Sequence, residues 1–172
     1  MKNKLLATLF ISVLLFFTAC DEDSITDAIL GSNSITLSGD INKSFDATSA
    51  AGMIHDDSIS VFAILMQPEN SGPNSYEDNL TLMKQSDALP AIGKYNIGYD
   101  ENSSDDFMGF YGANDTTMYM MYSGSVEITE SNTSKIAGTF NMTGYYGFIF
   151  PDSTRELKIT GNFSTIPIEF TQ

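Results

Sequence analysis

The chain has few residues of the types that carry catalysis or metal binding. His55 is the only histidine, and Asp56 and Asp57 follow it directly. An aspartate can orient an imidazole as a general base or a metal ligand, but nothing in the sequence marks a nucleophile beside this one. One histidine is also a poor basis for a zinc site. We therefore expect His55 to lie in a solvated turn at the end of a strand.

A second acidic segment, residues 100–106, offers oxygen ligands for a hard cation. Calcium binds six to eight oxygens at about 2.3–2.6 Å, and carboxylates and amides supply them. The segment lacks the glycine and the terminal glutamate spacing of an EF-hand loop. The sequence favours a solvated charged loop, with a weak calcium site on Asp100, Asn102, Asp105 and Asp106 as the alternative.

The main binding signal is a group of aromatic and methionine residues in the middle of the chain. Residues 118–122 read Met-Tyr-Met-Met-Tyr, and Phe110 and Tyr111 lie shortly before them. Aromatic rings stack on sugar faces, and methionine surfaces adapt to varied apolar partners. Successive strand residues point to opposite sides, so one side is expected in the core. Either the strand is buried on both sides, or one side lines a ligand or partner site, with Phe110, Tyr111, Tyr119 and Tyr122 as its candidates.

The only cysteine, Cys20, follows a short apolar run near the start of the chain. Lys2 and Lys4 precede this run, which extends over the 15 residues from Leu5 to Ala19. A membrane-spanning helix needs roughly 20 apolar residues, so the pattern predicts a signal peptide rather than an uncleaved anchor. A single cysteine excludes an intrachain disulfide, and the exported domain must therefore be held by its core alone.

The residues around Cys20 resemble a known processing signal. Phe17–Cys20 reads Phe-Thr-Ala-Cys and is similar to the lipobox of bacterial lipoproteins, with phenylalanine in place of the usual leucine. The resemblance implies lipidation of the Cys20 sulfur, cleavage after residue 19 and acylation of the new amino group. Each buried methylene contributes about 0.8 kcal/mol, so several acyl chains form a stable anchor.

The acidic segment Asp21–Asp23 follows the cysteine directly. It resembles the surface-export signal of Bacteroidota lipoproteins, whereas in enteric bacteria Asp21 would indicate retention at the inner membrane. A plain solvated spacer is the remaining reading. We expect an outer-membrane lipoprotein, with exposure on the cell surface as the implication of the export signal.

Charge and composition restrict the classes of partner. The 172 residues carry a formal net charge of −14. Because Lys2 and Lys4 lie in the predicted signal peptide, the six remaining basic residues face 22 acidic ones, a net charge of −16. This charge repels nucleic acids and anionic lipid surfaces, so we expect no nucleic-acid partner and a covalent membrane attachment. Twelve Phe and eight Tyr can fill a sizeable core.

From Ser34 onward the hydrophobic pattern is that of strands. Residues 59–66 are apolar in both phases, which is typical of a strand buried on both faces, although a short helix gives the same pattern. Ile136, Gly138, Phe140 and Met142 share one face, and Pro167 suits an edge strand. Nine to eleven short strands at roughly ten-residue spacing predict an all-β fold, an antiparallel meander closed as a β-sandwich or calycin-like barrel. We predict a signal peptide over 1–19, an acidic tether over 20–33 and one β domain over 34–172.

Several strand segments resemble a group of Bacteroidota lipoproteins of unknown function. The family's phrases correspond to Ile35–Ala47, Pro90–Tyr95, Tyr122–Thr129, Lys135–Phe140 and Leu157–Phe163, with Lys43 in place of the usual glycine. This resemblance implies the fold and the envelope location, and it brings no catalytic residue or cofactor. The Asp-Ser/Thr contexts of Ser24, Ser58, Thr116 and Ser153 resemble the Bacteroidota O-glycosylation motif.

The sequence leaves three functions open. The favoured one is a non-enzymatic lipoprotein that binds a glycan, a small apolar ligand or an envelope protein partner, without a cofactor. A small carboxylate-based hydrolase is the second, since glycoside hydrolysis needs only two carboxylates roughly 5–10 Å apart, but no pair is singled out. A purely structural envelope component is the third.

Overall fold

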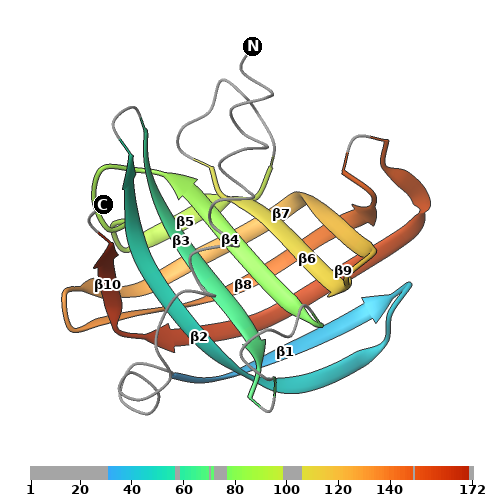
Figure 1. Ribbon diagram of the computed structural model, residues 1–172, viewed down its shortest axis with the longest axis horizontal. Helices are drawn as coiled ribbons and strands as arrows, with labels where there is room; N and C mark the ends of the chain where they lie inside the picture. Colours follow the sequence, from blue (N-terminus) through green and yellow to red (C-terminus); the bar gives the residue numbers. More distant parts are fainter. Residues whose placement is uncertain are drawn as a thin grey trace.

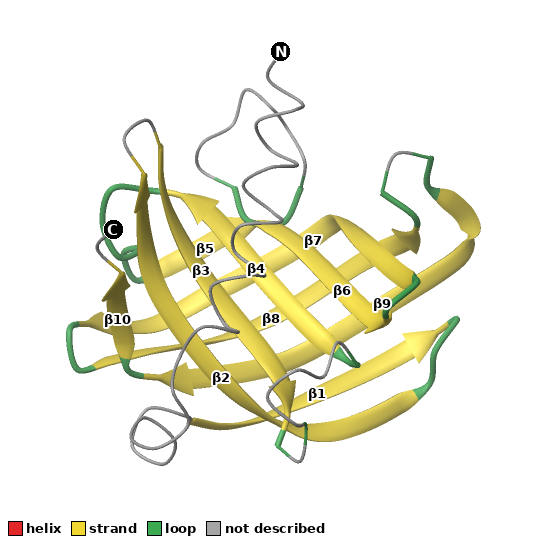
Figure 2. Cartoon of the chain, in the orientation of Figure 1, coloured by secondary structure: helices red, strands yellow, loops and turns green. Residues whose placement is uncertain are grey.

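A computed structural model of the chain describes residues 31–56, 59–69, 71, 77–98, 106–148 and 150–170 (Figure 1). These residues form ten strands and no helix (Figure 2). The strands are β1 (Gly31–Gly39), β2 (Lys43–Asp56), β3 (Ile59–Pro68), β4 (Asn79–Gln85), β5 (Gly93–Asn96), β6 (Met108–Asn114), β7 (Thr117–Asn132), β8 (Lys135–Tyr146), β9 (Asp152–Thr165) and β10 (Pro167–Phe170). The described residues contain no helix with the length and hydropathy of a membrane span.

The strands make one sheet that closes on itself. Neighbours follow the order β1-β9-β8-β7-β6-β4-β3-β2, and the antiparallel pairing of β1 with β2 completes the ring. The predicted all-β antiparallel fold is therefore confirmed, and the sheet closes in a barrel-like ring. Closure leaves the ring strands without long free edges, which is a common way for an antiparallel sheet to avoid edge-to-edge association.

Two short strands complete the sheet where the ring strands diverge. β5 pairs with Ser125–Ile128 of β7, beyond the part of β7 that pairs with β6. β10 runs parallel to β2 along residues 51–54. Among the described strands, β10 pairs with β2 alone, so the strand that begins at Pro167 is an edge strand, as predicted.

The interior of the ring is the main hydrophobic core. In β8 the even-numbered residues from Ile136 to Gly144 are buried and the intervening ones are more exposed, which confirms the predicted shared face. The largest fully buried side chains of the interior are Tyr111, Tyr119, Phe62, Phe107, Phe163, Ile35, Ile64, Met66, Leu80, Leu82, Met121 and Ile128.

A second, smaller apolar cluster lies on the other side of the same strands. It consists of Val61 and Ala63 of β3, Met83 of β4, Phe110 of β6 and Met120 of β7. Because Phe62 and Ile64 belong to the interior core, β3 is apolar and buried on both faces, as its sequence predicted. The outer side of β3, β4, β6 and β7 is therefore an apolar face rather than a solvated one.

Candidate functional site

The four aromatic candidates lie on two different faces of the sheet. Tyr111 and Tyr119 are register partners across β6 and β7, and both are fully buried in the interior. Phe110 and Tyr122 point outward and belong to the smaller apolar cluster. The predicted alternation along Met118–Tyr122 is confirmed, but the four residues do not form one binding platform.

The outward pair belongs to a group that we call the outer aromatic strip: Phe110, Met120, Tyr122, Tyr145 and Phe148. The register of β6, β7 and β8 places Phe110, Met120 and Tyr145 in one row across three strands. The Phe110 and Phe148 ring centroids are 5.9 Å apart, and those of Tyr122 and Tyr145 are 5.8 Å apart. Both ring pairs are tilted by 34°.

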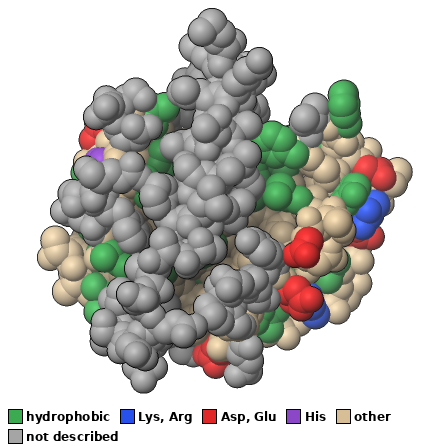
Figure 3. Space-filling view, in the orientation of Figure 1, with side chains coloured by type: hydrophobic (Ala, Val, Ile, Leu, Met, Phe, Trp, Pro, Cys, Tyr) green, Lys and Arg blue, Asp and Glu red, His purple; other side chains and the backbone are tan. Residues whose placement is uncertain are grey.

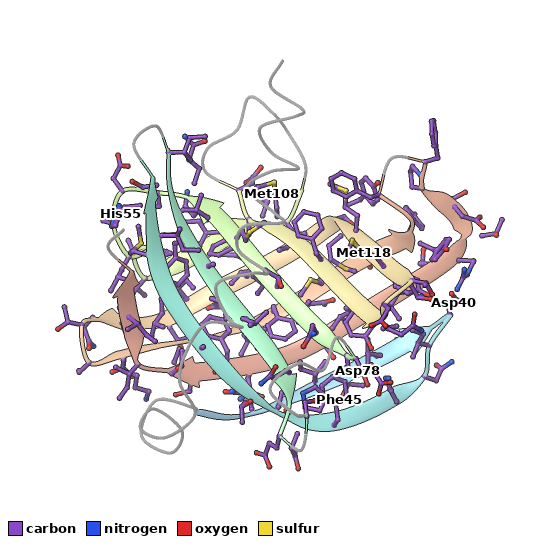
Figure 4. All side chains as sticks on the ribbon, viewed as in Figure 1. Asp40, Phe45, His55, Asp78, Met108 and Met118 are labelled. Carbon is purple, nitrogen blue, oxygen red and sulfur yellow. The ribbon has the colours of Figure 1, made fainter. Side chains whose placement is uncertain are left out.

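The strip has a buried floor and an accessible rim. Phe110 and Met120 are buried, Tyr122 and Tyr145 are half-buried, and Phe148 is 41% exposed. Figure 3 shows hydrophobic side chains gathered on this face, near β6, β7 and the connection between β8 and β9. Met108 and Met118, both half-buried, lie in the same region (Figure 4). Aromatic rings with adaptable thioethers beside them form a surface suited to apolar partners.

The inward pair forms a different constellation, the tyrosine–aspartate network. The Tyr111 hydroxyl donates a hydrogen bond to the Asp78 carboxylate, and the Tyr119 hydroxyl donates to the Asp40 carboxylate. Asp40 lies in the turn between β1 and β2, and Asp78 directly precedes β4; Figure 4 shows both on the same side of the barrel. The two tyrosine ring centroids are 6.2 Å apart, so the two rings lie side by side.

Each carboxylate of the network also has a cation. Lys43 forms an ion pair with Asp78. Arg155 Nε lies 2.9 Å from Asp40 Oδ2, and an Arg155 terminal nitrogen donates to the Tyr119 hydroxyl over 3.2 Å. The Arg155 guanidinium also lies 3.9 Å from the centre of the Tyr146 ring, which is the geometry of a cation–π contact. The donors and acceptors of the network therefore satisfy one another.

These contacts shift the pKa values of the groups that make them. Burial, and secondly the hydrogen bond to Asp40, raise the pKa of Tyr119 to about 12. The same two causes, burial and the bond to Asp78, raise the pKa of Tyr111. The hydrogen bond from Tyr119 and the Arg155 guanidinium hold the pKa of the Asp40 carboxyl below its ordinary value. Neutral phenols beside an ionised carboxylate suit structural hydrogen bonding, whereas general acid–base catalysis needs pKa values near the working pH.

His55 is placed differently from the prediction of a solvated turn. It lies within β2, half-buried, and its Nδ1 is 2.9 Å from the hydroxyl oxygen of Ser60, its register partner on β3. Figure 4 shows it on the side of the barrel away from Asp40 and Asp78. Among the described residues, no group of three or more His, Cys, Asp or Glu is placed to hold a metal ion.

Several predicted site residues lie outside the described residues, namely Cys20, Ser24, Ser58, Asp100, Asn102 and Asp105. The signal peptide and most of the acidic tether lie outside them too, while Gly31 to Asn33 of the predicted tether belong to β1. Asp106 of the acidic loop is half-buried. Thr116, in the turn between β6 and β7, and Ser153, in β9, are both exposed, as a modified hydroxyl requires.

Sequence reasoning missed Asp40, Asp78, Arg155 and Tyr145. A partial signal existed for the carboxylates, because a buried tyrosine hydroxyl needs a hydrogen-bond partner and this chain is rich in acidic residues. The particular partner is set by tertiary structure, since Asp40 is 79 residues from Tyr119.

Comparison with known proteins gives no family for the chain. No protein-family model, curated protein or solved structure matches it.

Proposed function

We propose that the protein is a non-enzymatic, lipid-anchored accessory protein of the bacterial outer membrane, which binds an apolar partner through its outer aromatic strip. The anchor is the lipidated Cys20, and the acidic residues behind it favour exposure on the cell surface. The strip is the observation that carries the binding role. An aromatic surface with a buried floor and a half-exposed rim is unusual on the outside of a barrel, where polar residues normally alternate with buried ones.

An apolar partner fits the strip better than a glycan does. Glycan sites combine an aromatic platform with polar groups that hydrogen-bond the sugar hydroxyls. Here the row across β6, β7 and β8 is Phe110, Met120 and Tyr145, and the flanking ring is Phe148. The strip itself therefore offers mainly aromatic area and one thioether. The polar register partners that flank the row, Thr81 beside Phe110 and Glu156 beside Tyr145, lie at its two ends.

The tyrosine–aspartate network does not supply the acid of a carboxylate-based hydrolase. The raised pKa values of Tyr111 and Tyr119 keep both phenols protonated at neutral pH, and the lowered pKa of Asp40 keeps that carboxylate ionised. A carboxylate-based hydrolase needs one carboxyl group with a raised pKa to act as the acid. The lowered pKa of Asp40 is the opposite of this requirement.

Labelling of the host with a palmitate analogue tests the anchor. The wild-type protein should incorporate the label and lose residues 1–19, and Cys20→Ala should do neither. A wild-type protein that takes up no label, or that retains Met1, would remove the envelope location and the roles inferred from it.

Site-specific photo-crosslinking in cells tests the strip. A crosslinking residue at Tyr122 should give a covalent adduct with a membrane component. The same residue at Thr160, which is exposed on β9, is the matched control and should give none. Equal adduct formation from both positions, or none from Tyr122, would contradict a role for the strip.

A further inference from the structure

The connection between β8 and β9 presents two phenylalanines to solvent: Phe148, which belongs to the outer aromatic strip, and Phe150. Phe150 is 89% exposed and Phe148 is 41% exposed. Large exposed hydrophobic side chains are few in the described part of the chain, and the other two, Ile92 and Ile166, lie on different connections. Figure 1 shows the β8–β9 connection projecting from the upper right of the barrel, and Figure 3 shows hydrophobic side chains at this corner.

The backbone holds this corner in place. Gly147 adopts a φ of +93°, and its amide donates to the Met118 carbonyl over 2.9 Å, which fixes the first residue of the connection to β7. Pro151 restricts the backbone directly after Phe150. The Phe148 ring packs against Phe110 of the strip. Phe148 is thus held in the strip, and Phe150 lies directly before the conformationally restricted Pro151.

We propose that this corner inserts Phe150 and Phe148 into the lipid bilayer to which the protein is tethered, so that the apolar partner of the strip is the membrane itself. A projecting apolar tip fits a fluid lipid surface, whereas a rigid protein partner would need a matching pocket. Exposed Phe side chains beside a membrane are typical of interfacial anchoring. This inference rests on the proposed lipid anchor at Cys20, which keeps the barrel beside a bilayer.

The length of chain before β1 permits the contact. Ten residues, 21–30, lie between Cys20 and the first residue of β1, which makes eleven Cα–Cα steps. At about 3.3–3.6 Å per step they span at most roughly 40 Å. β1 begins at the end of the barrel away from the corner, because its last residue, Gly39, pairs with Leu157 near the start of β9 (Figure 1). The corner therefore meets the bilayer when the barrel lies along the membrane surface. At such a distance even a weak apolar contact is favoured, because the second binding event is intramolecular.

Charge selects the kind of lipid. Residues 145–154 carry one charged side chain, Asp152, whose carboxylate accepts hydrogen bonds from the Thr154 amide at 3.0 Å and the Thr154 hydroxyl at 2.7 Å. Arg155, the nearest following cation, is engaged with Asp40 and Tyr146. The corner thus has no cationic group for anionic headgroups, and the contact should be made with zwitterionic lipids and be insensitive to salt.

The absence of tryptophan from the chain provides a clean test. The full chain with Phe150→Trp is expressed in the host, purified from the membrane fraction and reconstituted in phosphatidylcholine vesicles. Ile92→Trp, at a position 67% exposed on the β4–β5 connection, is the matched control. We expect the indole emission of the Phe150→Trp variant to shift to the blue and to lose most of its intensity when the vesicles contain brominated lipid, at low and at high salt. The emission of the Ile92→Trp variant should do neither.

Emission from the Phe150→Trp variant that stays as red-shifted and unquenched as that of the Ile92→Trp control would overturn the proposal. A shift that needs added host envelope proteins would overturn it too, because the partner would then be a protein. The mass of the purified chain shows whether Cys20 carries lipid. Where it carries none, the same variants are coupled through the Cys20 thiol to a maleimide lipid, so that the insertion of the corner is tested even if the natural anchor fails.

Discussion

The hydrogen bond between Tyr111 and Asp78 predicts an unusual order of stabilities among three variants. Tyr111 is fully buried, whereas the Asp78 side chain is 18% exposed and also pairs with Lys43. Removing the hydroxyl by Tyr111→Phe leaves a carboxylate that still has Lys43 and water. Removing the carboxylate by Asp78→Gly leaves a phenol in the core without its acceptor. Asp78 has a φ of +62°, a conformation that glycine adopts readily, so this substitution adds no backbone strain.

The magnitudes follow from these environments. A hydrogen bond to a charged group contributes about 1.5–3 kcal/mol, and the retained lysine offsets part of the loss, so Tyr111→Phe should cost about 1–2 kcal/mol. The unpaired phenol costs about 1–3 kcal/mol and the lost surface ion pair up to about 1, so Asp78→Gly should cost about 2–3 kcal/mol. Adding Tyr111→Phe to Asp78→Gly removes the unpaired hydroxyl, and the double variant should regain about 1 kcal/mol.

Urea unfolding followed by far-ultraviolet circular dichroism measures all three free energies of unfolding, and an unchanged slope shows that the unfolded states are comparable. Tyr95→Phe is the control, because the Tyr95 hydroxyl donates to the Ala91 carbonyl in an exposed place, over 2.8 Å, and its loss should cost below about 0.5 kcal/mol. A double variant less stable than Asp78→Gly alone would refute the reasoning.

Three further outcomes are expected. Because the pKa of Tyr119 is raised to about 12, its contribution to the free energy of unfolding is fully present below pH 10 and is lost as the pH rises towards about 12. The loss should be about 1–2 kcal/mol, since the hydroxyl lies at the edge of the core. Urea unfolding over this pH range should show a flatter decline for Tyr119→Phe. Gly138→Ala should cost about 3 kcal/mol or prevent folding, because an added methyl would lie 2.2 Å from a backbone oxygen of β7, whereas Gly98→Ala, with nothing within 4 Å, should be nearly neutral in thermal unfolding. Intact mass of protein from the host should show excess hexose that decreases in Thr116→Ala and in Ser153→Ala, and an unmodified mass would dismiss the glycosylation motif.

Local pattern predicted the strands that carry their own signal. The run of apolar residues in β3 predicted a strand buried on both faces, and the alternation in β8 predicted a strand buried on one face. The structure confirms both predictions. β2 was not predicted, because Lys43–Asp56 mixes Ser, Thr, Ala and Gly with few large apolar residues. Its position comes from pairing with β1, β3 and β10, which local composition does not encode. The Met-Tyr-Met-Met-Tyr motif and the Tyr122–Thr129 segment belong to one long strand, β7, bent by register shifts between Met121 and Ser123 and between Ile128 and Glu130.

The candidate site was predicted in its residue types and only partly in its arrangement. Alternation assigned Tyr119 and Tyr122 to opposite faces, which the burial of Tyr119 and the outward cluster of Tyr122 confirm. Alternation cannot say which face is interior, because both are apolar here. The partners of the buried hydroxyls could not be predicted from the sequence. Arg155 and Asp40, for example, are 115 residues apart and meet only because β1 pairs with β9.

The pairing of β1 with β9 also connects the tyrosine–aspartate network with the β8–β9 connection. Tyr145 and Tyr146 are consecutive, and the first lies in the outer strip while the second packs against the interior core and stacks under Arg155. Gly147 follows directly and begins the β8–β9 connection. Because Arg155 is itself held by Asp40, the last residue of β8 is fixed at the rim of the barrel immediately before the β8–β9 connection begins. A corner that must keep two phenylalanines in water before they meet a partner needs such support, since unsupported aromatic side chains tend to fold back onto nearby apolar surface. The contacts of Arg155 with Asp40 and Tyr146 therefore support the start of the β8–β9 connection.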